Sequence, residues 1–316
     1  MAAITILCWT VPRRGAEAGA VTVTRTHPAM PARRIGRVEV SAIGLGAMPL
    51  SVRGRPDERQ AIATLHAALD AGITLIDTAD AYHLDAGDPG HNESLIAAAL
   101  AAYGGDTSDV LVATKGGHTR PPDGSWALDG SPEHLRRAAD ASLRRLGVEA
   151  IGLYQYHRPD PAVPYAESLG ALKELYDAGK VRAVGVSNAG PDRIRLARDI
   201  LGEALVAVQN QFSPSFRSSL PELELCAEMG LAFLPWSPLG GMGEAGALGS
   251  RHRAFHEVAG ELGVSPQRVC LAWMLALSPC VIPIPGARRA VNVRDCALAA
   301  GLALSAEQVA RLNAGG

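Results

Sequence analysis

The sequence predicts one large (β/α)₈ barrel, an α/β fold in which eight parallel strands alternate with helices. The first observation is the length of 316 residues with 47% hydrophobic residues, enough for one barrel or two smaller domains. The second is that eight short apolar runs are each followed by a helical pattern, with no linker rich in Pro, Gly or Ser between them. A doubly wound sheet is the alternative, but it requires a glycine-rich phosphate turn after the first strand.

The composition argues against several partners and compartments. The net charge is −2, from 30 basic and 32 acidic residues, so nothing favours nucleic acid. The five cysteines are scattered without a Cys-x-x-Cys pair, which indicates neither a disulfide framework nor a zinc site and predicts a cytoplasmic location. No apolar run approaches the ~20 residues of a membrane helix, so no membrane partner is expected. The oligomeric state is left open.

Residues 1–34 differ from the rest and are expected to form a disordered N-terminal extension, with the barrel at 35–316. Residues 3–11 are weakly apolar, and the positive charge of Arg13 and Arg14 follows this run. A secretory signal has its charge before the apolar segment, so export is not predicted. Met30 is a candidate for the true start of the protein.

Strands are predicted from short apolar runs, and helices from apolar residues spaced three and four positions apart. Strands are predicted at 40–48, 73–76, 110–114, 151–156, 181–186, 205–209, 231–236 and 281–284. Helices are predicted at 56–71, 93–103, 132–146, 164–178, 191–200, 220–229, 251–262 and 266–277. Ser131 and Gly147 bound the third helix, and Ser305 with Gln308 makes a capping box for a final one.

Polar and aromatic residues follow the predicted strands where each strand ends. They are Asp77 and Tyr82, Lys115, His157, Ser187 and Asn188, Gln209, and Trp236. Each has an ordinary structural explanation, since a buried Lys often pairs with an Asp and a Trp is usually in the core. The carboxyl ends of barrel strands form one active face, however, so these residues are expected to converge on one mouth.

The chain resembles the aldo-keto reductases from about Arg37 to its C-terminus. Seven motifs occur in the family's order: Gly-Ile-Thr-Leu-Ile-Asp-Thr-Ala-Asp-Ala-Tyr (72–82), Ala-Thr-Lys-Gly-Gly (113–117), Leu-Tyr-Gln-Tyr-His (153–157), Val-Gly-Val-Ser-Asn (184–188), Gln-Asn-Gln-Phe (209–212), Pro-Trp-Ser-Pro-Leu (235–239) and Ile-Pro-Gly (284–286). The resemblance implies NADPH-dependent reduction of an aldehyde or ketone to an alcohol, without a Rossmann domain. It also implies a catalytic tetrad of Asp77, Tyr82, Lys115 and His157.

Elementary chemistry agrees with these roles. A carbonyl group that accepts hydride needs a proton donor, and a phenol with a pKa of ~10 is a weak one unless a cation lowers that value. Lys115 would supply the cation, and Asp77 would hold Lys115 in place. His157 could hydrogen-bond the developing alkoxide or orient the substrate.

The expected cofactor is NADPH, with NADH less favoured. Ser187, Asn188 and Gln209 carry the groups that a nicotinamide carboxamide requires, and Trp236 offers a flat face for the ring. The other cofactor residues expected are Ser237, Leu239 and Gly241 near the pyrophosphate, and Gly286, Arg288, Arg289 and Asp295 near the adenosine. Two departures from the family are Ala287, where Ser or Thr is common, and Cys296, where Asn usually contacts adenine.

The substrate pocket is expected to be open and permissive, with the loop at 116–130 as one wall. Its predicted residues are Met48, His83, Trp126 and Phe212. No metal is expected, because His252 and His256 have no further ligand at a suitable spacing.

Two other functions stay open. A Schiff-base aldolase would use Lys115 as the nucleophile, and a non-enzymatic regulatory subunit would only bind NADPH.

Overall fold

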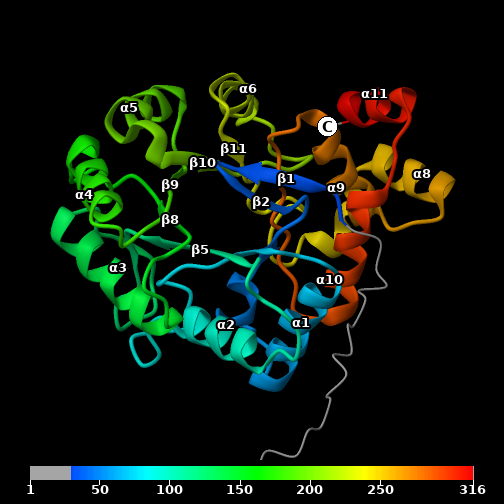
Figure 1. The fold of residues 1–316 in the computed structure, drawn as a ribbon. Helices are drawn as coiled ribbons and strands as arrows, with labels where there is room; N and C mark the ends of the chain where they lie inside the picture. The colour runs from blue at the N-terminus through cyan, green and yellow to red at the C-terminus, as the bar shows by residue number, and fades with distance from the viewer. Residues whose placement is uncertain (1–29, 316) are drawn as a thin grey trace, which may run out of the picture.

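Seven parallel strands form one curled sheet, with helices around its outside (Figure 1). The computed structural model describes residues 30–315, so positions 1–29 of the expected extension lie outside the described residues. The strands are hydrogen-bonded in the order β3 (Leu45–Gly46), β4 (Leu75–Asp77), β5 (Leu111–Gly116), β8 (Leu153–Tyr156), β9 (Val184–Ser187), β10 (Leu205–Gln209) and β11 (Ala232–Phe233). The sheet order follows the chain order, as in a barrel.

An eighth segment closes the barrel without forming a regular strand. Pro283 and Pro285 have no N–H, so this segment cannot donate a complete ladder. Their carbonyls instead accept hydrogen bonds from the N–H groups of Gly44 (2.9 Å) and Gly46 (3.0 Å). On the other side, the N–H of Ile282 donates to the carbonyl of Phe233 at 2.9 Å. The predicted barrel is therefore confirmed, with the strand expected at 281–284 replaced by these single bonds and two isolated bridges.

The helices lie outside the sheet and match the predicted ones closely, except that the helix at 290–297 was not predicted. They are α1 (Glu58–Asp70), α2 (His91–Ala102), α3 (Pro132–Leu146), α4 (Tyr165–Asp177), α5 (Pro191–Leu201), α6 (Leu220–Met229), α7 (Leu248–Arg251), α8 (Arg253–Leu262), α9 (Pro266–Leu277), α10 (Ala290–Ala297) and α11 (Ala306–Ala314). The expected caps are confirmed: Ser131 caps α3, Gly147 ends it in the left-handed conformation, and Ser305 and Gln308 form a capping box. The helix expected at 251–262 is broken at His252, which has extended backbone.

An antiparallel hairpin, β1 (Ala32–Ile35) and β2 (Val38–Ser41), covers the amino-terminal end of the barrel (Figure 1). Its residues Ile35 and Val40 pack on the apolar barrel interior. The strand predicted at 40–48 is thus divided between the hairpin and β3, and part of the expected extension, residues 32–34, lies in β1. Because the hairpin fills this end, the carboxyl ends of the strands are left for a site.

Gly46 provides a test of the closure, because a Cβ there would lie 2.7 Å from the carbonyl oxygen of Ile284. We expect Gly46→Ala to lower the free energy of unfolding by about 2 kcal/mol, since overpacking would push the closing segment away. Gly170→Ala is the matched control, because that position is inside α4 with open space around it, and alanine should stabilise the helix slightly. Urea unfolding followed by circular dichroism measures both, and equal stability changes would contradict the proposed closure.

Candidate active site

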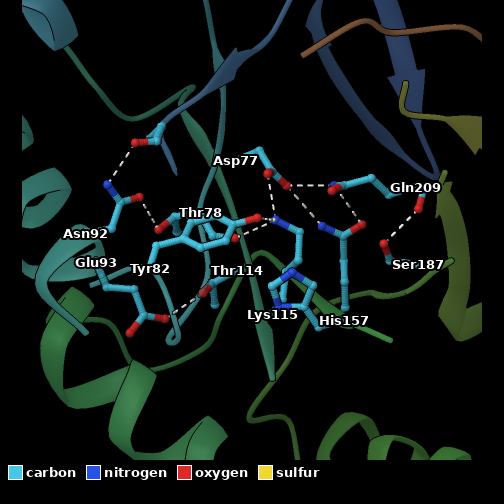
Figure 2. Close-up of polar contacts among 12 residues, drawn as sticks. Asp77, Thr78, Tyr82, Asn92, Glu93, Thr114, Lys115, His157, Ser187 and Gln209 are labelled. Carbon is cyan, nitrogen blue, oxygen red and sulfur yellow. Dashed lines mark hydrogen bonds and ion pairs between the residues drawn. The ribbon is translucent and has the colours of Figure 1, made fainter. Parts of the chain in front are cut away.

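Lys115 is the centre of the polar network at the carboxyl ends of the strands (Figure 2). Its side chain is 0% exposed at the end of β5. The ammonium group has three protons and three acceptors within reach: Asp77 Oδ1 at 2.6 Å, the Thr78 carbonyl at 2.7 Å and the Tyr82 hydroxyl at 3.2 Å. Burial alone lowers the pKa of Lys115, but Asp77 and Tyr82 together outweigh burial and the net direction is upward, so the amine stays charged.

The second oxygen of Asp77 is held by two amides from across the barrel. Asp77 Oδ2 accepts hydrogen bonds from Gln209 Nε2 at 2.7 Å and from Gln155 Nε2 at 3.2 Å. These two side chains come from β10 and β8, and Lys115 comes from β5. Three strands therefore hold the Asp77 carboxylate in place. Sequence reasoning missed Gln155, although a buried Gln two residues before a strand-end His is an available signal.

A second network holds the segment that carries Tyr82. Asn92, at the start of α2, accepts a hydrogen bond from the Thr78 hydroxyl at 2.6 Å (Figure 2). Its amide also donates to the carbonyl of Ala47 at 2.9 Å. Its own N–H donates to the carbonyl of Tyr82 at 3.3 Å. Asn92 is fully buried and was not predicted. Asn92 therefore binds the polar turn after β4 at two points, the Thr78 side chain and the Tyr82 backbone.

Tyr82 keeps its proton in this environment. Burial raises the pKa of the phenol, and Lys115 opposes the rise without cancelling it. The lowered pKa expected from the sequence is therefore wrong in net direction, because desolvation of the phenolate outweighs the cation. The ring of Tyr82 meets the rings of His157 and Trp126 edge to face, at centroid distances of 5.6 and 6.5 Å.

His157 is neutral in the structure. Burial, together with the charge of Lys115, holds the pKa of this imidazole well below its usual range. Its Nδ1 is buried and has no hydrogen-bond partner among the described residues. A neutral imidazole can donate one hydrogen bond and accept another, so His157 has capacity for a bound oxygen atom. The ring of His118 lies against the His157 ring, with 4.3 Å between the ring centroids.

Ser187 is the last residue of β9 and Asn188 follows it, and their polar groups are hydrogen-bonded to each other. Asn188 has a left-handed φ of 57°, and its amide donates to Ser187 Oγ and to the His157 carbonyl, both at 3.0 Å. Ser237, after Trp236, also has a positive φ of 50°. In residues 30–315, Asn188 and Ser237 are the only such non-glycine residues. Backbone strain of this kind concentrates at functional sites.

Most of the predicted site residues line one cleft of about 880 Å³. Of the predicted site residues, the cleft is lined by Met48, Asp77, Tyr82, Trp126, His157, Ser187, Asn188, Gln209, Trp236, Ser237, Leu239, Gly241, Gly286, Arg288 and Arg289. Lys115 lies directly beneath, bonded to two of them. Sequence reasoning missed Arg53, Arg158 and Asn292, which also line the cleft. Of these three residues, only Arg158 could have been predicted from the sequence, because it directly follows His157.

Besides Lys115, three predicted site residues do not line the cleft. Phe212 is 1% exposed and stacks on Trp273, because a fully apolar ring gains more from the core than from the cleft wall. His83 turns to its own loop, with Nδ1 2.6 Å from the carbonyl of Asp85. Asp295 on α10 forms an ion pair with Arg268 of α9.

The described residues give no sign of a metal site or a membrane span. No group of three or more His, Cys, Asp or Glu side chains between residues 30 and 315 could hold a metal ion. His252 hydrogen-bonds Ser215 Oγ at 2.8 Å. None of the helices in the described part of the chain is long and apolar enough to cross a membrane.

Comparison with known proteins identifies related chains. The model of the aldo/keto reductase family matches residues 42–315. The chain is 37% identical over 274 residues to 6-dehydroglucose reductase of Novosphingobium aromaticivorans, covering 83% of this chain and 88% of the relative. It is 32% identical over 290 residues to pyridoxine 4-dehydrogenase of Escherichia coli, covering 88% and 96%. The crystal structure of an aldo/keto reductase from Klebsiella pneumoniae, in complex with NADP and acetate, matches with a TM-score of 0.74 and 25% identity, covering 90% of this chain and 95% of that chain.

The imidazole of His118 allows a test of the electrostatics. Burial, followed by the charge of Arg158, lowers the pKa of His118 to about 4. Between this value and the ~6.5 of an unfolded His, the unfolded chain binds the additional proton, so stability contributed by His118 is lost as the pH falls. We expect the His118 Cε1 proton to titrate near pH 4 by NMR, with His118→Gln identifying the signal. The same variant should flatten part of the loss of stability between pH 6.5 and 4. A midpoint near 6.5 would contradict the environment described.

Proposed function

Because the chain belongs to the aldo-keto reductase family and is an NAD(P)H-dependent oxidoreductase, we propose that it reduces an aldehyde or ketone to an alcohol, with NADPH as cofactor and Tyr82 as proton donor. The observation that carries this proposal is the hydrogen bond from Lys115 Nζ to the Tyr82 hydroxyl in the floor of the cleft. Members of the family act on small carbonyl compounds, so the substrate is expected to enter this cleft.

The residues of the cleft fit a nicotinamide. Trp236 has an indole whose Nε1 is without a partner among the described residues, and Ser187 and Asn188 line the same cleft with a hydroxyl and an amide. A reduced nicotinamide supplies a hydride when bound. Tyr82 would give its hydroxyl proton to the carbonyl oxygen, and Lys115 would stabilise the phenolate that remains. His157 would donate a hydrogen bond to the same oxygen and orient it.

The preference for NADPH is proposed from the arginines at the other end of the cleft. Arg288 donates to the carbonyls of Pro49 (3.3 Å) and Arg53 (3.2 Å) and has no carboxylate partner in residues 30–315. Arg289 and Arg53 line the same region. Guanidinium groups without acidic partners suit the 2′-phosphate that distinguishes NADPH from NADH.

The Schiff-base alternative is less well supported. A nucleophilic Lys must be neutral and accessible, whereas Lys115 is fully buried, and Asp77 and Tyr82 together hold the pKa of its amine above the ordinary value. A regulatory subunit that only binds NADPH would not require a hydrogen-bonded Tyr–Lys pair. Turnover separates these functions, because neither alternative predicts cofactor oxidation coupled to loss of a carbonyl.

Replacement of Tyr82 tests the mechanism. Tyr82→Phe should reduce the single-turnover rate of NADPH oxidation with a good aldehyde by ~10²- to 10⁴-fold, because the ring stays and the transferable proton is lost. Lys115→Met should have a similar effect, and the double variant should cost much less than the product of the two. Circular dichroism would check that each variant is folded.

Tyr165→Phe is the matched control for the loss of a phenolic hydroxyl. The Tyr165 hydroxyl is outside the cleft and has no hydrogen-bond partner among the described residues, so its removal should leave the rate unchanged. A near wild-type rate for Tyr82→Phe would reject Tyr82 as the proton donor. A borohydride-trapped adduct on Lys115 would instead support the aldolase.

Replacement of Arg288 and Arg289 by Ala tests the cofactor preference. The double variant should weaken NADPH binding about 10-fold or more, because each hydrogen bond to a charged group contributes appreciably, and should change NADH binding little. Fluorescence titration with the two cofactors measures this. Arg294→Ala is the control, since Arg294 is exposed on α10 but does not line the cleft. Equal losses for NADPH and NADH would show that the two arginines do not select the phosphate.

A further inference from the structure

The substrate end of the cleft carries more positive charge than the proposed chemistry uses. Five arginines line the cleft, and Asp77, which pairs with Lys115, is the one carboxylate among its described lining residues. Arg53, Arg288 and Arg289 suit the cofactor phosphate. Arg120 and Arg158 remain without a function.

Arg120 belongs to the loop that forms a wall of the cleft. Its guanidinium lies over the ring of Trp126 at 4.2 Å, and Nη2 donates to the carbonyl of Leu84 at 2.7 Å. Within residues 30–315, its buried Nε has no hydrogen-bond partner and its guanidinium forms no ion pair with a carboxylate. Asp123 is within electrostatic range but fully exposed, and its pKa is lowered mainly by the Ser125 N–H. The guanidinium is therefore held in place while part of its hydrogen-bonding capacity is unused.

Arg158 directly follows His157 in the chain and also lines the cleft. Its Nη2 donates to Asn188 Oδ1 at 3.3 Å, and among residues 30–315 no carboxylate forms an ion pair with it. Both arginines help to lower the pKa of His118, so both lie within electrostatic range of that imidazole. The centroid of the His118 ring lies 4.3 Å from that of His157 and 5.3 Å from that of Trp126.

The aromatic rings connect this positive region to the reacting end. Trp126 meets both Arg120 and the ring of Tyr82, so the guanidinium is separated from the proposed proton donor by one indole. A substrate whose carbonyl oxygen meets Tyr82 and His157 would extend along Trp126 toward Arg120 and Arg158. Trp126 is 47% exposed, so this path is open to solvent.

We infer that the substrate is a carbonyl compound with an anionic group, a carboxylate or phosphate, which Arg120 and Arg158 bind. This inference rests on the proposed function, because it names the class of substrate for the same cleft. Hydrogen bonds between a guanidinium and such an anion are charge-assisted and geometrically specific. Two guanidinium groups that have no acidic partner among residues 30–315 also raise the local concentration of an anion.

The test compares substrates that differ only in charge at a distance from the carbonyl. With saturating NADPH, kcat/KM is measured for 4-formylbenzoate and its methyl ester, and for pyridoxal 5′-phosphate and pyridoxal. We expect the wild-type protein to prefer the anion of at least one pair about 10-fold. Preference within the first pair would identify a carboxylate, and preference within the second a phosphate.

Arg120→Met and Arg158→Met keep an unbranched stem similar to the methylene part of arginine and remove the guanidinium with its charge. Each should reduce the ratio of kcat/KM for anion over neutral partner several-fold, mainly through KM, while turnover of the neutral partner persists. Arg158→Lys should retain part of the preference. Arg136→Met removes a charge from the outer surface of α3, where Arg136 pairs with Glu174, and should leave the ratio unchanged. Comparing ratios removes intrinsic differences in carbonyl reactivity.

The outcomes separate this inference from the proposed function. If the neutral compounds are reduced but neither anion is preferred, the anionic substrate is rejected and the reductase stands. The same conclusion follows if Arg120→Met and Arg158→Met lower kcat/KM for the anionic and the neutral compound of a pair equally. If none of the four compounds nor a wider panel of aldehydes and ketones is reduced with NADPH, the proposed function fails, and this inference fails with it.

Discussion

The buried charge of Lys115 is the constraint on which the site depends. Removing an ammonium group from water costs several kcal/mol unless its protons are hydrogen-bonded and its charge is balanced. Here the three acceptors are a carboxylate, a backbone carbonyl and a phenol, so the charge is balanced and the donors are used. The same arrangement that makes Lys115 tolerable in the interior brings it into contact with Tyr82. Stability and chemistry therefore depend on the same hydrogen bonds.

This constraint requires a closed barrel. The residues around the charge come from β4, β5, β8 and β10, and these strand ends meet only because the sheet curves around. Curvature is maintained at the junction where Gly44 and Gly46 donate to Pro283 and Pro285, since a side chain at Gly46 would not fit there. The fold thus places Gln155 and Gln209 opposite Asp77, where both amides reach one carboxylate oxygen.

Local patterns predicted much of this architecture, and non-local contacts decided the rest. Caps such as Ser131 and Ser305 and the polar strand ends depend on neighbouring residues, so the sequence predicted them. Phe212 was misplaced because its direction depends on Trp273, which is distant in sequence. The division of residues 40–48 depends on the hairpin packing on the barrel interior. The pKa of Tyr82 depends on burial, which neighbouring residues do not reveal.

The floor and the walls of the cleft differ in how their charges are arranged. In the floor, Lys115 and Asp77 are paired, buried and held by strands, so few substitutions could change the reacting end without loss of folding. In the walls, Arg120 belongs to a loop and Arg158 follows a strand end, and neither has an acidic partner among the described residues. Wall residues can therefore change without leaving a buried charge unpaired. It follows that the choice of substrate can be altered separately from the proton transfer.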